Sequence, residues 1–162
     1  MITQSELKNI LHYDQDTGVF TWAIQKSLTI KVGDVAGSLS GNGYNQIFIN
    51  RKSYKAHRLA WLYVYGEFPN KFIDHINGIR NDNRIINLRN VTKSENSQNQ
   101  KTARTNNKSG FLGVSWEKKS HKWRASIRYN NKTTYIGLYE TKELAHEAYL
   151  TKKREVHSCC TI

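Results

Sequence analysis

The chain has 162 residues and a net charge of +12, with 25 lysines and arginines against 13 aspartates and glutamates. It has no apolar run long enough to span a bilayer and no signal-peptide-like N-terminus, so we expect an intracellular protein without a membrane partner. Its two cysteines, Cys159 and Cys160, are adjacent, a spacing that favours neither a disulfide framework nor a zinc site.

The first 65 residues predict short helices and strands. Thr3 and Glu6 form the pattern of a capping box, which begins a short helix. Residues 44–56 predict a β-hairpin, and residues 57–65 predict a helix. The side chains that we expect this helix to bury are Leu59, Trp61, Leu62 and Tyr65. We interpret His57, at the start of the helix, as a structural histidine, with a catalytic role as the alternative.

The positive charge is concentrated in the middle of the chain. Residues 51–100 contain nine basic and four acidic residues, and residues 101–135 contain nine basic residues and one acidic residue. A polyanion is the natural partner of such a distribution, so we expect the protein to bind double-stranded DNA. A basic surface without a specific partner is the alternative interpretation.

An apolar run that ends in Asp74 and His75 predicts a strand leading into a site. Asp74 offers the carboxylate oxygen that Mg²⁺ prefers. His75 titrates near neutral pH and could take a proton from water. Neighbours on a strand point to opposite faces, so the pair meets one ligand only where the strand ends, as Asn77 and Gly78 indicate.

Asparagines downstream offer further ligands. Asn87 could accept a hydrogen bond from the imidazole and fix its tautomer. Thr92 and Glu95 predict the cap of a helix whose second turn holds Asn96, and the amide oxygen of Asn96 could be a second metal ligand. Asn99, one turn later on the same face, is the alternative ligand.

Residues 13–99 resemble the HNH nuclease family, in the phage-type, homing-endonuclease branch whose last motif residue is asparagine. The matching positions are Asp74, His75, Asn87 and Asn96, together with residues 56–61 and 87–89. The resemblance implies that Asp74 and Asn96 hold Mg²⁺ or Mn²⁺, that His75 is the general base and that Asn87 orients it. It also implies 5′-phosphate and 3′-hydroxyl products. The paired cysteines of zinc-binding relatives are missing, so we expect no structural zinc.

Residues 101–109 are polar and basic, which predicts a linker. Arg104 and Lys108 would lie along a DNA groove, and a solvated tether is the alternative. Beyond the linker, three strands and a helix capped by Thr141 are expected. We expect this helix to turn an inner stripe toward the sheet, formed by Leu144, Ala145, Ala148 and Tyr149. Trp123 and Ala125 alternate with Arg124 and Arg128, so the two arginines would lie on the open face.

Residues 109–157 resemble the plant ethylene-response-factor (APETALA-type) DNA-binding domain. The matching segments are 113–114, 122–125, 135–137 and 147–149. By this resemblance, the DNA contacts come from the open sheet face and from the preceding strand and turn. The expected DNA-binding residues are Trp116, Lys118, Lys119, Lys122, Arg124 and Arg128.

The sequence therefore predicts an α+β protein. An HNH nuclease domain with N-terminal β-hairpins and a ββα-metal core occupies residues 1–100, and a DNA-binding domain with a three-stranded antiparallel sheet packed on one helix occupies residues 110–162. We expect a monomeric DNA endonuclease that nicks one strand at a time. A non-catalytic DNA-binding regulator is the main alternative, and an RNA-binding protein is a weaker one.

Overall fold

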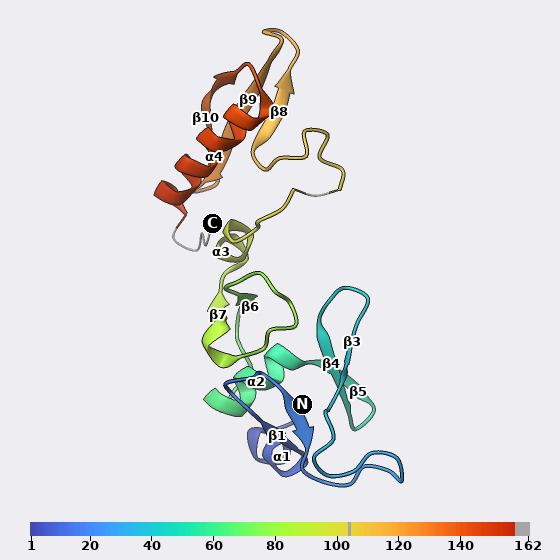
Figure 1. Ribbon diagram of the computed structural model, residues 1–162. Coiled ribbons are helices and arrows are strands. Elements are labelled where there is room, and N and C mark those ends of the chain that lie inside the picture. The colour runs from blue at the N-terminus through green and yellow to red at the C-terminus, as the bar shows by residue number, and fades with distance from the viewer. Residues whose placement is uncertain (104, 158–162) are drawn as a thin grey trace. The chain divides into compact units, whose positions relative to one another are not determined.

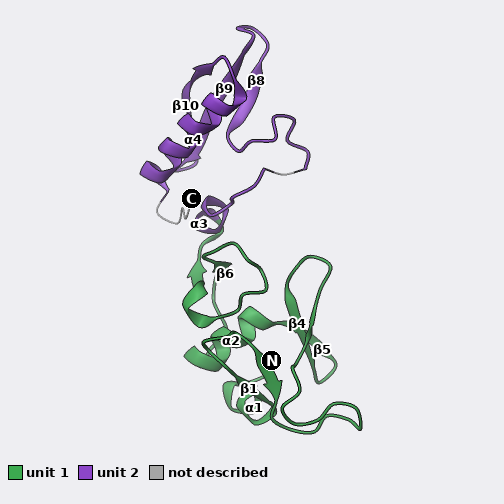
Figure 2. Cartoon of the chain, in the orientation of Figure 1, with its two compact units in different colours: residues 1–93 green, residues 94–162 purple. Residues whose placement is uncertain are grey.

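The computed structural model of the protein describes residues 1–103 and 105–157. The chain divides into two compact units, residues 1–93 and 94–162 (Figures 1 and 2). Arg104, which we expect to contact DNA, and the cysteine pair lie outside the described residues. The domain boundary after residue 100 and the linker stay predictions.

Unit 1 begins with helix α1 (Gln4–Ile10) and an antiparallel pair of strands, β1 (Leu11–Tyr13) and β2 (Phe20–Trp22). The predicted capping box is confirmed. The Thr3 hydroxyl accepts from the N–H of Glu6 at 3.2 Å, and the Glu6 carboxylate accepts from the N–H of Thr3 at 2.8 Å. Two donors at the helix start are thereby satisfied.

A three-stranded antiparallel sheet follows, in the order β3 (Ser38–Leu39), β4 (Asn45–Ile49) and β5 (Lys52–Lys55). The β4–β5 hairpin turns at Asn50 and Arg51, where φ is 48° and 62°. Two consecutive residues with positive φ give the turn whose twist matches that of the flanking strands. The predicted hairpin is confirmed.

Helix α2 (Ala56–Tyr65) leaves directly from β5 and ends at Gly66, which has a φ of 85°. Glycine adopts this left-handed conformation without a Cβ clash. The helix buries Ala56, His57, Leu59, Ala60 and Leu62. Tyr65, which we expected to be buried, is 54% exposed and lies against the ring of Trp61, with 4.3 Å between ring centroids. The buried stripe therefore contains Ala60 in place of Trp61, and it ends at Leu62.

Strands β6 (Phe72–His75) and β7 (Leu88–Val91) pair antiparallel, with the 3₁₀ turn η1 (Ile85–Asn87) just before β7. The predicted strand ending in Asp74 and His75 is confirmed. Leu88 lies in the unit 1 core with side chains of α1, β2, β4 and α2. This core therefore anchors the base of the hairpin that carries the candidate site.

Unit 2 contains a three-stranded antiparallel sheet of β8 (Val114–Glu117), β9 (Lys122–Tyr129) and β10 (Lys132–Tyr139), with β9 in the centre. The predicted turn between β9 and β10 is confirmed at Asn130 and Asn131, where φ is 48° and 61°. Helix α3 (Lys93–Gln98) spans the division between the units.

Helix α4 (Lys142–Val156) packs on one face of this sheet, and the predicted cap is confirmed because the Thr141 hydroxyl accepts from the N–H of Leu144. The predicted inner stripe is wrong at Leu144, which is 50% exposed. The predicted burial of Ala145 and Tyr149 is confirmed, and the helix also buries Lys153. Lys153 is satisfied in this position because its Nζ donates to the carbonyl oxygen of Gln100 at 2.6 Å.

The described residues are thus a mixture of short helices and small antiparallel sheets, as the α+β class requires. The ββα-metal geometry stays a prediction. Within residues 1–103 and 105–157, no helix has the length and apolar character needed to cross a membrane.

Candidate active site

Asp74 and His75 are the last two residues of β6, and both are buried. Asp74 lies opposite Arg89 of β7 in the strand register. The guanidinium Nε and Nη2 of Arg89 donate to Oδ2 of Asp74 at 2.9 and 2.7 Å. Hydrogen bonds between a charged guanidinium and a charged carboxylate hold the carboxylate in one orientation.

The strand turns immediately after His75, as the sequence indicates. The N–H of Gly78 donates to the carbonyl oxygen of His75 at 2.9 Å, and Gly78 has a φ of 79°. The side chains of Asp74 and His75 have different neighbours: Asp74 contacts Arg89, whereas Nε2 of His75 lies 3.4 Å from Oδ1 of Asn83. The pair therefore lies where the chain leaves the sheet.

Two rings, those of His57 and Tyr44, lie beside the candidate base His75. The ring of His57 lies edge-on to that of His75, with 5.1 Å between centroids, and Tyr44 lies 5.2 Å from His57 and 5.9 Å from His75. Burial lowers the pKa of His75 below its usual range. Burial, and then the proximity of His75, lowers the pKa of His57 to about 3. Both imidazoles are therefore neutral at pH 7.

Asn87 is held in the loop after β6 rather than against the imidazole. Its Oδ1 accepts from the N–H of Asn77 at 3.0 Å, and its Nδ2 donates to Oδ1 of Asn77 and to the carbonyl oxygen of Asp82 at 3.1 and 2.8 Å. Its own carbonyl oxygen accepts from the N–H of Ile76. The side chain beside Nε2 of His75 is that of Asn83, and the contacts of Asn87 are with the backbone and side chains of the loop.

Two further contacts fix the loop. The Tyr13 hydroxyl donates to the carbonyl oxygen of Asn83 at 2.6 Å. Arg84 donates from Nε and Nη2 to the Asp82 carboxylate, and this hydrogen bond lowers the pKa of Asp82 to about 2. Gly18 lies against the loop so closely that a Cβ there would be 2.4 Å from the nitrogen of Arg84. The loop is thus packed on β1 and on the turn that follows it.

The donor set fits a hard divalent cation that keeps most of its water. Asp74 supplies a carboxylate oxygen, and Mg²⁺ is commonly held by one or two carboxylates with water and substrate phosphate. Among residues 1–103 and 105–157, no three histidines, cysteines, aspartates or glutamates gather as a metal site. Asn96, the expected second ligand, lies in α3, and Asn99, the alternative, is buried just after that helix. Both belong to unit 2.

The expected DNA-binding residues of unit 2 lie on two faces of its sheet. Ala125, on the face that α4 covers, pairs with Val114, and Trp116 pairs with Trp123 on that same face. Arg124 alternates to the open face, where its guanidinium lies 5.5 Å from the ring centroid of Tyr135. Trp116, on the helix side of the sheet, is 47% exposed. The tryptophan and the arginines therefore face different directions.

The lysines expected to contact DNA are all on the surface. Lys118 and Lys119 lie in the β8–β9 turn, and Lys122, at the start of β9, pairs with Glu140 at 2.7 Å. Lys108 lies in a turn closed by Asn107, whose Oδ1 accepts from the N–H groups of Ser109 and Gly110. Lys108, Trp116, Lys118 and Trp123 also line one cavity of unit 2.

The sequence did not single out Tyr44, Asn83 or the role of Arg89. The antiparallel register of β6 and β7 brings Arg89 to Asp74 although the two are 15 positions apart. A local sequence pattern cannot predict which residues of two strands lie opposite each other. Tyr44 reaches the site from the connection between β3 and β4. A signal was present only for Asn83, which lies in the polar loop that follows His75.

The chain resembles known nucleases and a phage protein. Residues 54–98 match the family described as HNH endonuclease. The chain is 34% identical over 115 residues to Protein 3.8 of Escherichia phage T7, and the match covers 66% of this chain and 93% of that protein. A solved structure titled "DNA binding and cleavage by the HNH homing endonuclease I-HmuI" matches with 23% identity and a TM-score of 0.44, over 85% of this chain and 76% of that one. The chain belongs to the family of phage T7 Protein 3.8 and carries an HNH endonuclease domain.

Proposed function

We propose that this protein is a metal-dependent DNA endonuclease that hydrolyses one phosphodiester bond at a time. The observation that carries the proposal is the buried, neutral imidazole of His75, next to Asp74 at the end of β6, inside the segment that matches the HNH endonuclease family. The net charge of +12 suits a DNA substrate.

His75 is the general base in this proposal. A neutral imidazole can accept a proton at pH 7, and burial favours the neutral form. If Nε2–H donates to Oδ1 of Asn83, the lone pair that accepts the proton is on Nδ1. The water oxygen then bonds to phosphorus while the bond from phosphorus to the 3′ oxygen breaks. The products are a 5′-phosphate and a 3′-hydroxyl.

Asp74 would supply a carboxylate ligand to Mg²⁺ or Mn²⁺, and Asn96 as the second ligand remains a prediction from the resemblance. When bound, such an ion would supply positive charge to offset the charge of the phosphate and of the leaving oxygen. Arg89 keeps one oxygen of Asp74 engaged, so it fixes the direction in which the carboxylate presents its other oxygen. No structural zinc is required.

Asn87 is a positioning residue in this scheme. Its side chain joins Asn77 to Asp82 across the loop, and its carbonyl oxygen accepts from Ile76, the residue after His75. Loss of these contacts would let the end of β6 move. Catalysis is sensitive to such movement because the base must stay within hydrogen-bonding distance of the attacking water.

Unit 2 would hold the enzyme on DNA. Arg124 and Arg128 lie on the open face of the sheet, where they can meet phosphates or guanine edges, and Lys118, Lys119 and Lys122 extend the same charge. The APETALA-type resemblance and the homing-endonuclease branch remain predictions. A single site of this kind cuts one strand, so a monomer would nick.

The test uses the full-length protein, supercoiled plasmid and Mg²⁺, with EDTA as the metal control. His75→Ala removes the proposed base, and His12→Ala removes an exposed histidine of β1 as the matched control. We expect relaxed circles from the wild type and from His12→Ala, and none with EDTA or with His75→Ala. Tight, salt-sensitive DNA binding without cleavage, across Mg²⁺ and Mn²⁺, would instead identify a DNA-binding regulator.

A further inference from the structure

Tyr44 lies at the centre of a cluster that the roles above do not use. Its ring is 5.9 Å from that of His75 and 5.2 Å from that of His57. Two cations lie over the same ring: Nζ of Lys55 at 4.6 Å and the guanidinium carbon of Arg80 at 5.4 Å from the centroid. A tyrosine ring thus holds two positive charges next to the proposed base.

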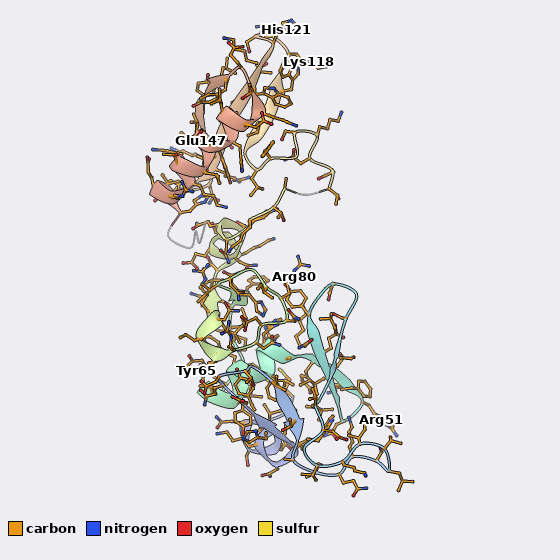
Figure 3. All side chains as sticks on the ribbon, in the orientation of Figure 1. Arg51, Tyr65, Arg80, Lys118, His121 and Glu147 are labelled. Carbon is orange, nitrogen blue, oxygen red and sulfur yellow. The ribbon has the colours of Figure 1, made fainter. Side chains whose placement is uncertain are left out.

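Arg80 comes from the loop after β6, and it reaches the hairpin between β3 and β4 (Figure 3). Its Nη1 donates to the carbonyl oxygen of Asn42 at 2.9 Å, and its Cδ would be 3.7 Å from a Cβ built on Gly43. A guanidinium has five N–H donors, so this one bond leaves donors available for a ligand. The contact also links the loop after β6 to the connection between β3 and β4, which carries Tyr44.

The cations around His75 divide into two kinds. Arg89 and Arg84 are paired with Asp74 and Asp82 at 2.7 and 2.6 Å, so their charge is balanced locally. Arg80 and Lys55 are exposed, and within residues 1–103 and 105–157 neither forms an ion pair with a carboxylate. The uncompensated charge therefore lies on two exposed side chains that share the ring of Tyr44.

We propose that Arg80, Lys55 and Tyr44 form a phosphate-binding subsite, which holds a DNA backbone phosphate next to the one that is hydrolysed at His75. The inference deepens the proposed nuclease function and rests on it. An arginine fork matches the geometry of a phosphate, and a lysine adds a point charge. The tyrosine ring orients both cations before DNA binds, which reduces the conformational entropy that they lose on binding. Tyr44 itself would not stack on a base.

The subsite is tested by removing one charge at a time. Arg80→Ala and Lys55→Ala each remove a proposed phosphate contact, and Arg80→Lys keeps the charge but loses the fork. Lys8→Ala is the matched control, because Lys8 also lies over a tyrosine ring of unit 1, at 5.2 Å from the centroid of Tyr63. Binding to a short DNA duplex is measured in EDTA over a range of KCl concentrations, and plasmid cleavage is measured with Mg²⁺.

We expect Arg80→Ala and Lys55→Ala each to reduce the slope of log Kd against log [KCl] by about 0.9, the value for one lost phosphate contact. Each should also lower kcat/KM by about tenfold, as the loss of one charged hydrogen bond implies. Arg80→Lys should retain the salt slope and recover part of kcat/KM. Lys8→Ala should match the wild type in both measurements.

The subsite is refuted if Arg80→Ala and Lys55→Ala have the same salt slope and kcat/KM as Lys8→Ala. A wild-type protein that binds DNA but does not cleave it overturns the nuclease proposal alone, because the binding slopes in EDTA still decide whether Arg80 and Lys55 contact phosphate. A fall in kcat/KM without any change in salt slope would assign Arg80 a structural role in the loop and would also overturn the subsite.

Discussion

At the scale of single residues, the ion pair with Arg89 fixes the orientation of the Asp74 carboxylate. The Asp74 and Arg89 side chains are 9% and 23% exposed, against 14% and 45% for the Asp82–Arg84 pair in the same hairpin loop. A buried charge that loses its partner is costly, whereas an exposed pair contributes little. The two arginines are therefore a natural comparison.

We predict that Arg89→Ala lowers the free energy of unfolding by about 2 kcal/mol, because Asp74 keeps its buried charge without its partner. Arg84→Ala should cost less than about 1 kcal/mol. Urea denaturation of the full-length protein, followed by amide hydrogen exchange in residues 72–91, measures both. Equal losses would show that the burial of the Asp74 pair has no energetic consequence.

His57 makes stability depend on pH. Burial lowers its pKa from 6.5 to about 3, so the folded state binds this proton less readily than the unfolded state. The contribution of neutral His57 to the free energy of unfolding is therefore fully present above pH 6.5, and it is lost as the pH falls from 6.5 toward 3. The slope for one such group is about 1.4 kcal/mol per pH unit.

We predict that His57→Phe, which keeps a ring against Tyr44 and His75, has a shallower loss of stability below pH 6.5 than the wild type. Both proteins keep His75, and the ring-for-ring substitution preserves its packing, so the difference between the two curves reports the titration of His57. Denaturation curves at pH 7, 6, 5 and 4.5 measure the difference. Parallel curves would mean that His57 is protonated equally in the folded and unfolded states.

At the scale of elements, local sequence patterns predicted individual caps, turns and strands, but they did not predict the contacts between elements. The Thr3 cap, the hairpin at Asn50 and the strand ending at His75 depend on neighbouring residues, and they were predicted correctly. The contacts of His75 with Asn83 and Tyr44 depend on packing between separate elements. Periodicity gave the helical character of α4 but misplaced Leu144, because an aliphatic side chain at the edge of a stripe need not face the core.

The close approach of Gly18 to Asn83 and Arg84, in the loop after β6, is another contact between elements. Gly18 has a φ of 73°, and a Cβ would lie 2.4 Å from the nitrogen of Arg84 and 2.6 Å from the carbonyl carbon of Asn83. Gly33 also has a positive φ, of 89°, but a Cβ there would meet no atom within 4 Å. A substitution would strain the backbone at both glycines, because both have a positive φ. Only at Gly18 would the new side chain also clash with neighbouring atoms.

We predict that Gly18→Ala displaces the loop that carries Asn83 and lowers cleavage at least tenfold, because a small displacement of the base is costly. Gly33→Ala should retain nearly wild-type cleavage, with a loss of stability of about 1 kcal/mol from strain alone. Plasmid nicking rates and hydrogen exchange in residues 77–84 measure the two effects. Similar nicking rates for the two variants would mean that the loop absorbs the clash.

At the scale of the whole molecule, the basic residues of unit 2 lie on both sides of its sheet. The open sheet face of unit 2 carries Arg124 and Arg128, while α4, which packs on the other face, begins with Glu143 in its first turn and carries Lys142 and Lys152. If unit 2 binds DNA through the open face, the location of a charge matters more than the total. Net charge alone could not identify this face from the sequence, because it depends on strand alternation and on which face the helix covers.

We predict that Arg124→Ala with Arg128→Ala weakens DNA binding at least tenfold and reduces the salt slope by about 1.8, the value for two lost phosphate contacts. Lys142→Ala with Lys152→Ala removes the same charge from α4 and should leave both quantities close to wild type. At saturating DNA, kcat should be unchanged in either double variant, because Asp74 and His75 belong to unit 1. Measurements of Kd against KCl concentration and of nicking at saturating DNA distinguish binding from catalysis. Equal losses from the two double variants would mean that unit 2 attracts DNA by its total charge, and a fall in kcat would mean that the arginines also act on the hydrolysis step.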